Sequence, residues 1–157
     1  MRAKGPRGKV TQEGRFVMTI KELVMKVQNR TGELAAIIGH LHENDVKVHA
    51  LWVGAEKKKA TLRLITSDPD GAVSALTGLG LKAETVDVIA AQVPSHPGGL
   101  NTILRILALE KIDIHHVYPC IQMEDTVLIL EVDKTGQAAR VLKENWINLY
   151  DERLYRM

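Results

Sequence analysis

Two short segments, residues 29–34 and residues 95–101, combine glycine with polar side chains in a way that could bind an anion. Each follows an alternating apolar run and precedes apolar residues at helical spacing, so each is predicted to be a turn from a strand into a helix. A glycine lets the backbone approach a ligand closely, and the first N–H groups of a helix have no partner inside the helix. The predicted chemistry is therefore recognition of a small carboxylate by backbone donors.

The histidines do not form a recognisable metal site. His40 and His42 are two positions apart on a predicted helix, and His115 and His116 are neighbours on a predicted strand, so neither pair converges on one ion. No P-loop, nucleophile elbow, dinucleotide fingerprint or zinc-hydrolase spacing is present either. We therefore expect a protein that is not an enzyme and that uses neither a metal nor another cofactor.

Several other residues are open to two interpretations. Cys120 could be a nucleophile, but no pattern of His and Asp points to it, so a buried strand thiol is the favoured interpretation. Trp52 and Tyr118 occupy equivalent positions in the two halves of the chain and would either line a pocket or pack at an interface. His49 and His115 also coincide, which favours a place on an uncovered sheet face or at the seam between the halves.

The composition is that of a soluble globular protein. The chain has 157 residues, 45% hydrophobic and 25% charged, and no apolar stretch reaches the length of about 18 residues that a membrane span needs. We therefore expect no membrane partner. A single cysteine excludes an intrachain disulfide and fits a reducing compartment, so a cytoplasmic location is expected.

Residues 1–18 are predicted to be a flexible basic tail. Residues 1–17 carry five lysines and arginines against one glutamate, so they contribute +4 to the net charge of +2 and the rest of the chain contributes −2. A nucleic-acid-binding fold would carry its basic excess on the folded part. We therefore do not expect nucleic acid as a partner, and a binding arm formed by the tail alone is the lesser alternative.

Apolar periodicity predicts the order strand, helix, strand, strand, helix, strand, and predicts it twice. In the first half, the strands are expected near residues 23–27, 46–52, 62–64 and 81–88, and the helices near residues 34–41 and 69–78. A shift of 66 residues without a gap places the core and turn positions of one half on those of the other. Gly32, for example, meets Gly98.

This order is that of the ferredoxin-like βαββαβ unit, an antiparallel sheet with two helices on one face. The predicted fold class is therefore α+β, with one unit at residues 19–88, a second at residues 89–152, and a C-terminal tail at residues 153–157. No linker separates the two units, because an apolar run passes from the last strand of one into the first strand of the next. We therefore expect a fixed pair with a seam that could hold a ligand.

The segment Pro97-Gly98-Gly99-Leu100 is followed by an apolar helical stripe at residues 103–107, and Val46–Val48 and Ile112–Ile114 stand at equivalent second-strand positions. Together with the βαββαβ order, these residues resemble the ACT domain. The resemblance extends over about residues 19–152. It is to small stand-alone proteins with two ACT domains and no catalytic domain.

The resemblance implies a regulatory module that binds an amino acid at an interface between two ACT units, against the turn after the first strand. The ligand-binding residues that it implies are Ser95, His96, Pro97, Gly98, Gly99, Leu100 and Asn101 in the second turn, and Asn29, Arg30, Thr31, Gly32, Glu33 and Leu34 in the first. Thr31 stands where the family usually has proline, and Glu33 places a negative charge beside the first turn. The second turn is therefore the favoured site.

The predicted function is that of a non-catalytic regulatory or sensor protein, which binds an amino acid or a similar small carboxylate at the seam between the ACT units. Its expected partners are this ligand and a second copy of the chain, in a homodimer. The alternative is a ligand-free structural module for dimerisation or protein interaction. A seam filled by side chains would favour the alternative, and an open pocket bordered by Gly98 would favour the sensor.

Overall fold

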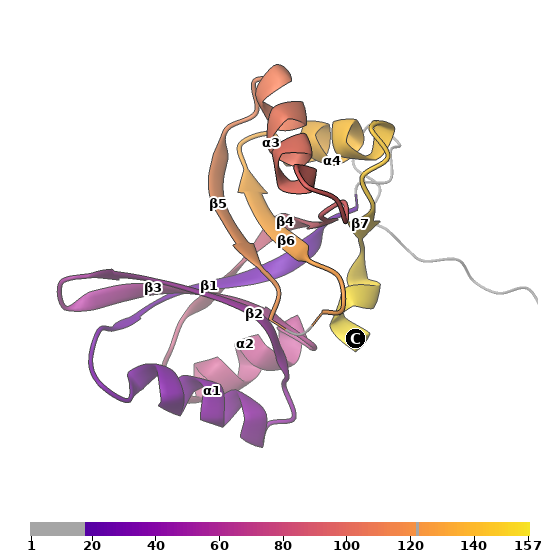
Figure 1. The fold of residues 1–157 in the computed structure, drawn as a ribbon. Helices are drawn as coiled ribbons and strands as arrows, with labels where there is room; N and C mark the ends of the chain where they lie inside the picture. The colour runs from indigo at the N-terminus through magenta and orange to yellow at the C-terminus, as the bar shows by residue number, and fades with distance from the viewer. Residues whose placement is uncertain (1–17, 122) are drawn as a thin grey trace, which may run out of the picture.

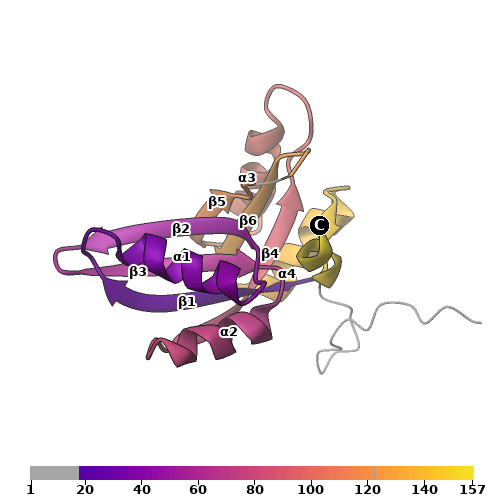
Figure 2. The same cartoon turned by 90° about the horizontal axis from the view of Figure 1, so that it is seen from below.

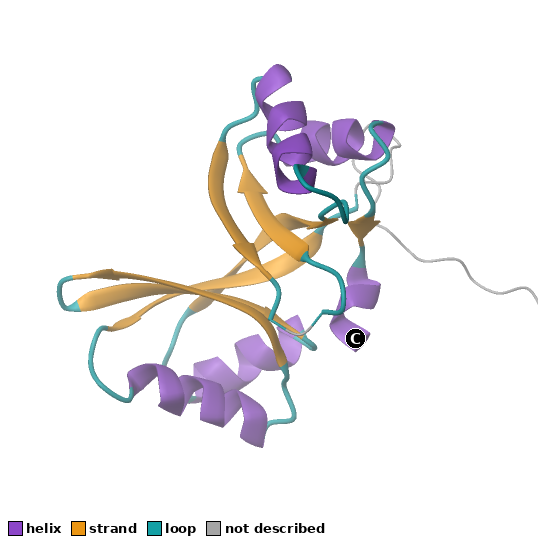
Figure 3. Ribbon diagram, in the orientation of Figure 1, coloured by secondary structure: helices purple, strands orange, loops and turns teal. Residues whose placement is uncertain are grey.

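The computed structural model describes residues 18–121 and 123–157 (Figures 1 and 3). The predicted basic tail lies outside the described residues apart from Met18, and so does the alternative of a nucleic-acid arm. The described chain has the predicted α+β class, with two helices on one face of each sheet. None of its described helices is long and apolar enough to cross a membrane.

The first unit consists of β1 (Ile20–Gln28), α1 (Glu33–Glu43), β2 (Val48–Glu56), β3 (Lys59–Thr66), α2 (Pro69–Gly78) and the first half of β4 (Ala83–Gln92). The predicted start of α2 is confirmed: the Asp68 carboxylate accepts a hydrogen bond of 3.0 Å from the Gly71 N–H, and Pro69 fills the first helical position.

The second unit repeats this order. It consists of the second half of β4, α3 (Gly99–Leu109), β5 (Ile114–Pro119), β6 (Val127–Val132), α4 (Thr135–Glu144) and β7 (Leu149–Tyr150). The predicted pair of βαββαβ units is therefore confirmed. The register is also repeated, because Leu23 lies opposite Leu64 in the first unit and Ile89 lies opposite Leu130 in the second, 66 positions further on.

Strand β4 belongs to both units. Residues 83–88 pair with β1, whereas residues 89–92 pair with β6, and Ala90 and Ala91 also pair with β7. The strand order is β2-β3-β1-β4-β6-β5, with β7 beside this path. The ten residues of β4 span about 30 Å in extended conformation, so the two units hold opposite ends of one strand.

Each unit contributes one part of this continuous sheet, and these two parts are called here the two sheets. Their faces that carry no helices pack against each other. Figure 1 shows α1 and α2 on one outer side of the molecule and α3 and α4 on the other, and Figure 2 gives the view from below. The apolar cluster between the sheets consists of Ile20, Ala50, Ile65, Val88, Ala90, Tyr118, Val127, Ile129 and Leu154. At one edge the Ile121 N–H donates to the His49 carbonyl at 2.7 Å, which joins β2 to the segment after β5.

Residues 153–157 do not extend from the domain as the predicted tail. Residues Glu152–Arg156 form a 3-10 helix, η1, whose Leu154 is completely buried in the cluster between the sheets. The Lys21 N–H donates to the Tyr155 hydroxyl at 2.6 Å, and Nε2 of His49 lies 3.2 Å from the Tyr155 carbonyl. The C-terminal segment therefore covers one end of the seam, because its single leucine removes apolar surface from water.

Candidate functional site

Both predicted turns contain a glycine in the left-handed region of backbone conformation. Gly32 (φ 84°) precedes α1, and Gly98 (φ 91°) precedes α3. Residues other than glycine disfavour this conformation, because their Cβ atoms approach the following carbonyl oxygen. In both turns, no capping side chain accepts a hydrogen bond from the first N–H groups of the helix.

The second turn offers free backbone donors. The Gly99 N–H donates to the His96 carbonyl at 3.0 Å. The N–H groups of Leu100 and Asn101 have no hydrogen-bond partner within residues 18–121 and 123–157. Because they lie at the positive end of the α3 dipole, a carboxylate placed there would be stabilised.

The two adjacent glycines of this turn have different roles. A Cβ atom on Gly99 would lie 2.0 Å from the Pro94 carbonyl oxygen, so the close packing of the turn requires glycine there. A Cβ atom on Gly98 would meet nothing within 4 Å. Gly99 therefore fixes the shape of the turn, and Gly98 faces open space.

The polar side chains of the second turn are accessible. Nδ1 of His96 lies 3.0 Å from the Pro97 carbonyl, which holds the ring beside the turn. The exposed residues of the predicted set are Ser95, His96, Pro97, Gly98, Leu100 and Asn101, whereas Gly99 is buried. Asn101 presents an amide oxygen that could accept a hydrogen bond from an ammonium group.

The first turn is occupied by its own charges. Nε of Arg30 lies 2.9 Å from Oε2 of Glu33, and Thr31, Gly32 and Leu34 complete the turn. The Asn29 N–H and side-chain amide donate to the carbonyls of Lys58 and Lys57, both at 2.9 Å, and so hold the tip of the β2–β3 hairpin against this turn. The Arg30–Glu33 pair makes the first turn a poorer carboxylate site than the second.

The structure does not bring the two turns together within one chain. In Figure 1, α1 lies at the bottom of the molecule and α3 at the top, and the turns precede these helices on different units. Glu33 therefore cannot bind an ammonium group held at the second turn of the same chain. The seam between the units holds the apolar cluster described above, and the residues of the two predicted turns are not part of that cluster.

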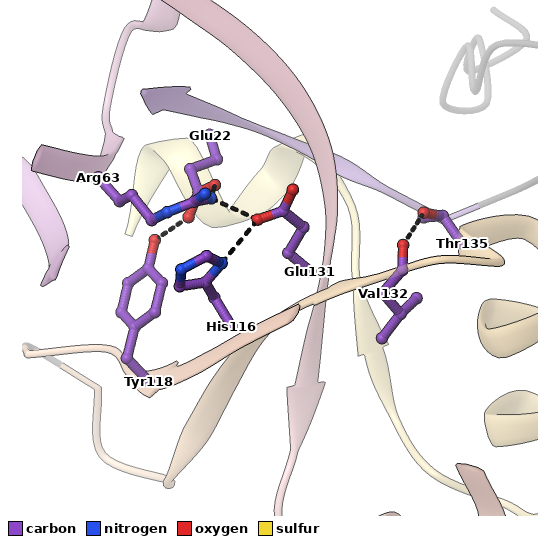
Figure 4. A network of polar contacts seen from close by, with 7 residues as sticks. All are labelled: Glu22, Arg63, His116, Tyr118, Glu131, Val132 and Thr135. Atoms are coloured by element: carbon purple, nitrogen blue, oxygen red, sulfur yellow. Dashed lines mark hydrogen bonds and ion pairs between the residues drawn. The ribbon is translucent and has the colours of Figure 1, made fainter. Parts of the chain in front are cut away.

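The seam contains a buried polar network that the sequence interpretation missed (Figure 4). Nη1 of Arg63 on β3 donates to Glu22 on β1 at 2.7 Å and to Glu131 on β6 at 2.5 Å. The Tyr118 hydroxyl on β5 donates to the second oxygen of Glu22, and Nδ1 of His116 lies 3.0 Å from Oε2 of Glu131. The network therefore joins strands of both units by charge-assisted hydrogen bonds.

Burial raises the pKa values of two members of this network, Glu22 and Tyr118. Glu22 is fully buried, and loss of water raises its pKa, although the hydrogen bonds from Tyr118 and Arg63 oppose this effect. Burial and the neighbouring Glu22 raise the pKa of Tyr118, so its hydroxyl remains a donor at neutral pH. Nε of Arg63 is buried without a partner among the described residues, because both carboxylates use Nη1.

Trp52 covers the network rather than lining a pocket. Its ring meets the His116 ring edge-on, with centroids 4.9 Å apart, and Cζ of Arg63 lies 6.0 Å from the centre of the Trp52 ring. Gly54 makes room for the indole, because a Cβ atom there would lie 2.3 Å from it. The packing interpretation of Trp52 and Tyr118 is the one that the structure supports.

The other candidates take no part in a site. His49 is buried at the seam, His115 is exposed, and both lie at an irregularity of strand register that recurs in the two units. Cys120 is half-buried, and burial raises its pKa to about 11, which favours the protonated thiol at neutral pH. Within the described residues, no three His, Cys, Asp or Glu side chains are placed to hold a metal ion.

The fold consists of two βαββαβ units joined through one strand, each with a glycine turn at the start of its first helix. The family model described as "ACT domain pair" matches residues 18–157, and the chain therefore belongs to this family. The match covers every residue that the structure describes. A search of curated proteins found no match.

Solved structures give the same fold. A protein of Bacteroides thetaiotaomicron is 26% identical, with a TM-score of 0.82 over 89% of this chain and 98% of that one. The regulatory subunit of aspartate kinase from Thermus thermophilus, in a ligand-free form, is 15% identical, with a TM-score of 0.57 over 82% and 93% of the two chains. The corresponding subunit from Thermus flavus is 14% identical, with a TM-score of 0.53 over 83% and 94%.

Proposed function

We propose that this ACT domain pair is a non-catalytic regulatory protein that binds an amino acid or a similar small carboxylate at the second turn. The observation that carries the proposal is the pair of free donors, the N–H groups of Leu100 and Asn101, beside the open position of Gly98. Two oxygens of one carboxylate can accept from two such donors. The likeness in fold to regulatory subunits of aspartate kinase supports a regulatory role.

The other predicted residues of the turn supply the rest of the site. Ser95, His96 and Asn101 are exposed polar groups that could receive the ammonium group and polar side-chain atoms of the ligand, while Pro97 and Gly99 keep the turn in shape. The first turn, residues 29–34, is at most a weaker second site because of the Arg30–Glu33 pair. The proposed setting is a cytoplasmic homodimer whose association changes when the ligand binds.

Calorimetric titration with the standard amino acids tests the proposal, and two matched variants locate the site. Gly98→Ala and Gly32→Ala place the same methyl group at similar φ values, so each should lower the free energy of unfolding by about 1 kcal/mol. Only Gly98→Ala is expected to weaken binding, by about tenfold or more. No heat with any amino acid, or equal binding by both variants, would contradict the proposal.

One observation favours the second candidate function, a ligand-free association module. The seam between the units contains apolar side chains and the Arg63 network, which is the arrangement that favours the ligand-free interpretation. In that case association would be the same with and without amino acids and would be unaffected by Gly98→Ala. Sedimentation of wild type and variant in both conditions separates the two functions.

A further inference from the structure

Trp146 is the most exposed large apolar side chain among the described residues. Its side chain is 95% exposed, and its φ of 62° lies in the left-handed region, which bulky residues disfavour. The equivalent residue of the first unit is Gly80, with φ 75°, and both residues follow the second helix of their unit and donate to the carbonyl three positions earlier. At this position of the repeat, the second unit has tryptophan where the first has glycine. Glycine adopts this backbone conformation with less strain than tryptophan does, and the exposed indole gains no packing in return.

Trp146 belongs to the end of the second unit that carries the second turn. The Gln137 amide donates to Glu110 and the Lys134 ammonium to the Lys111 carbonyl, so α4 begins where α3 ends and the two helices run antiparallel. The end of α4, with Trp146, is therefore directed toward the same end of the unit as the beginning of α3, where Leu100 is 48% exposed. This end of the molecule therefore presents two exposed apolar side chains.

The same end carries negative charge. Glu124 and Asp125 are exposed in the loop before β6, and Asp125 accepts a hydrogen bond of 2.6 Å from Gln92. Gln92 in turn accepts one of 2.9 Å from Asn148, two residues after Trp146. The surface formed by Leu100, Glu124, Asp125 and Trp146 is called here the acidic end.

The equivalent end of the first unit carries the opposite charge. Lys58 and Lys59 stand 66 positions before Glu124 and Asp125, and Lys57 and Arg30 are exposed beside them. The hydrogen bonds of Asn29 to the hairpin tip hold these four cations together. This surface, formed by Arg30, Lys57, Lys58 and Lys59, is called the basic end, and it belongs to the first unit whereas the acidic end belongs to the second.

We propose that the acidic end of one chain docks on the basic end of a second copy, with Trp146 as the apolar anchor. Long lysine and arginine stems cover an indole ring well, and their charges lie favourably over its face. A two-fold axis lets each copy use both ends, which closes the dimer. This inference specifies the surface of the proposed homodimer, and it needs no ligand, so its test is separate from the calorimetric test above.

Sedimentation of the full chain without ligand, at about 0.02 M and about 0.5 M salt, is the first measurement, since the higher concentration screens surface charges. Wild type is expected to dimerise and to dissociate at high salt. Trp146→Gly restores the residue found at position 80, so it is expected to keep or raise the melting temperature while weakening dimerisation at least tenfold. A monomeric wild type at low salt, or an unchanged dimer of Trp146→Gly, would overturn the proposal.

Charge reversal provides the decisive comparison. Lys57→Glu/Lys58→Glu/Lys59→Glu leaves Arg30 as the one cation of the basic end and so makes both ends acidic, and Glu124→Lys/Asp125→Lys makes both ends basic. Each variant alone is expected to be monomeric, and an equimolar mixture is expected to form a mixed dimer, because every end then meets an opposite charge. The control, Glu43→Lys/Lys47→Glu on exposed residues at the other end of α1, should dimerise as wild type does. Dimerisation of either reversed variant alone, or no mixed dimer, would place the interface elsewhere.

Discussion

Nη1 of Arg63 lies 2.5 Å from Oε2 of Glu131, although the two residues are 68 positions apart and belong to different units. The same nitrogen lies 2.7 Å from Glu22 of its own unit. One buried guanidinium thus holds two carboxylates across the seam. The arrangement ties the two sheets together by charge as well as by apolar packing, because an unpaired charge in the seam would be costly.

Removal of the cation should be more damaging than removal of one anion. Arg63→Met leaves Glu22 and Glu131 without their shared partner, so we expect the free energy of unfolding to fall by about 3 kcal/mol. Glu131→Gln leaves the Arg63–Glu22 pair intact and should cost about 1 kcal/mol. Urea unfolding at neutral pH measures both changes. Equal losses of unfolding free energy in the two variants would contradict this prediction, because losing the shared cation would then be no worse than losing one of its two anions.

The raised pKa of Glu22 predicts a pH dependence of stability. A carboxyl whose pKa is higher in the folded state binds its proton more tightly there, so its contribution to stability is full below the unfolded pKa of about 4.5. That contribution is lost as the pH rises through the raised pKa. The difference in the free energy of unfolding between wild type and Glu22→Gln should therefore change across this range.

Urea unfolding at a series of pH values measures this difference, and Glu56→Gln, on an exposed side chain, is the control. Wild type should lose stability relative to Glu22→Gln as the pH rises above about 4.5. The Glu56→Gln difference should stay flat. A Glu22→Gln difference that is equally flat would mean that burial of Glu22 does not set its titration.

The two glycines of the second turn should respond differently to one methyl group. Gly99→Ala drives Cβ against the Pro94 carbonyl oxygen, and we expect a loss of about 3 kcal/mol because backbone must move. Gly98→Ala has space and costs only the left-handed conformation, about 1 kcal/mol. Thermal unfolding of the two variants ranks them. The reverse order would contradict the division of roles between the two residues.

The C-terminal helix η1 should stabilise the whole domain. Leu154→Ala empties a fully buried position in the cluster between the sheets, and such truncations cost about 2 to 5 kcal/mol. Arg153→Ala, next to it and exposed, should change the stability little. Chemical unfolding of both variants provides the measurement. If both variants unfold as wild type does, η1 does not contribute to the core.

The apolar positions of each half predicted the fold because they repeat at strand and helix spacing, and because both glycine turns recur 66 positions apart. The element order, the two units and the shared run through β4 all follow from this pattern. The residues of the C-terminal helix η1 were predicted as a tail, since the five residues 153–157 are too few to show an apolar period. Leu154 is buried because it packs into a cluster whose other residues are distant from it in the sequence.

The polar network could not be predicted from alternation alone. Glu22 and Arg63 lie on the strand faces opposite the helices, which alternation treats as solvent-exposed, and only the packing of one sheet on the other buries them. The repeat contains a usable signal, however. Glu22 stands where the second half has Val88, and Arg63 where it has Ile129, both buried in the cluster between the sheets. A charge at a position that is apolar in the other half indicates a buried partner.

The second turn could be predicted as a strand-to-helix corner, but its accessibility could not. The free N–H groups depend on the absence of a capping side chain at the start of α3, and the separation of the two turns depends on how the units pack. The proposed position of the ligand, outside the seam, rests on the apolar cluster between the units. The packing of the units against each other therefore determines how accessible each turn is, which the sequence pattern of one unit does not predict.

The most direct test of the account is an NMR titration of the backbone amides with the standard amino acids, because it observes the proposed donors themselves. We predict that one or more amino acids shift the amide resonances of Leu100 and Asn101 most strongly and in a saturable way, while the amides of the first turn change less. If no amino acid shifts these two resonances, or if the largest shifts lie elsewhere in the chain, the second turn is not the ligand site.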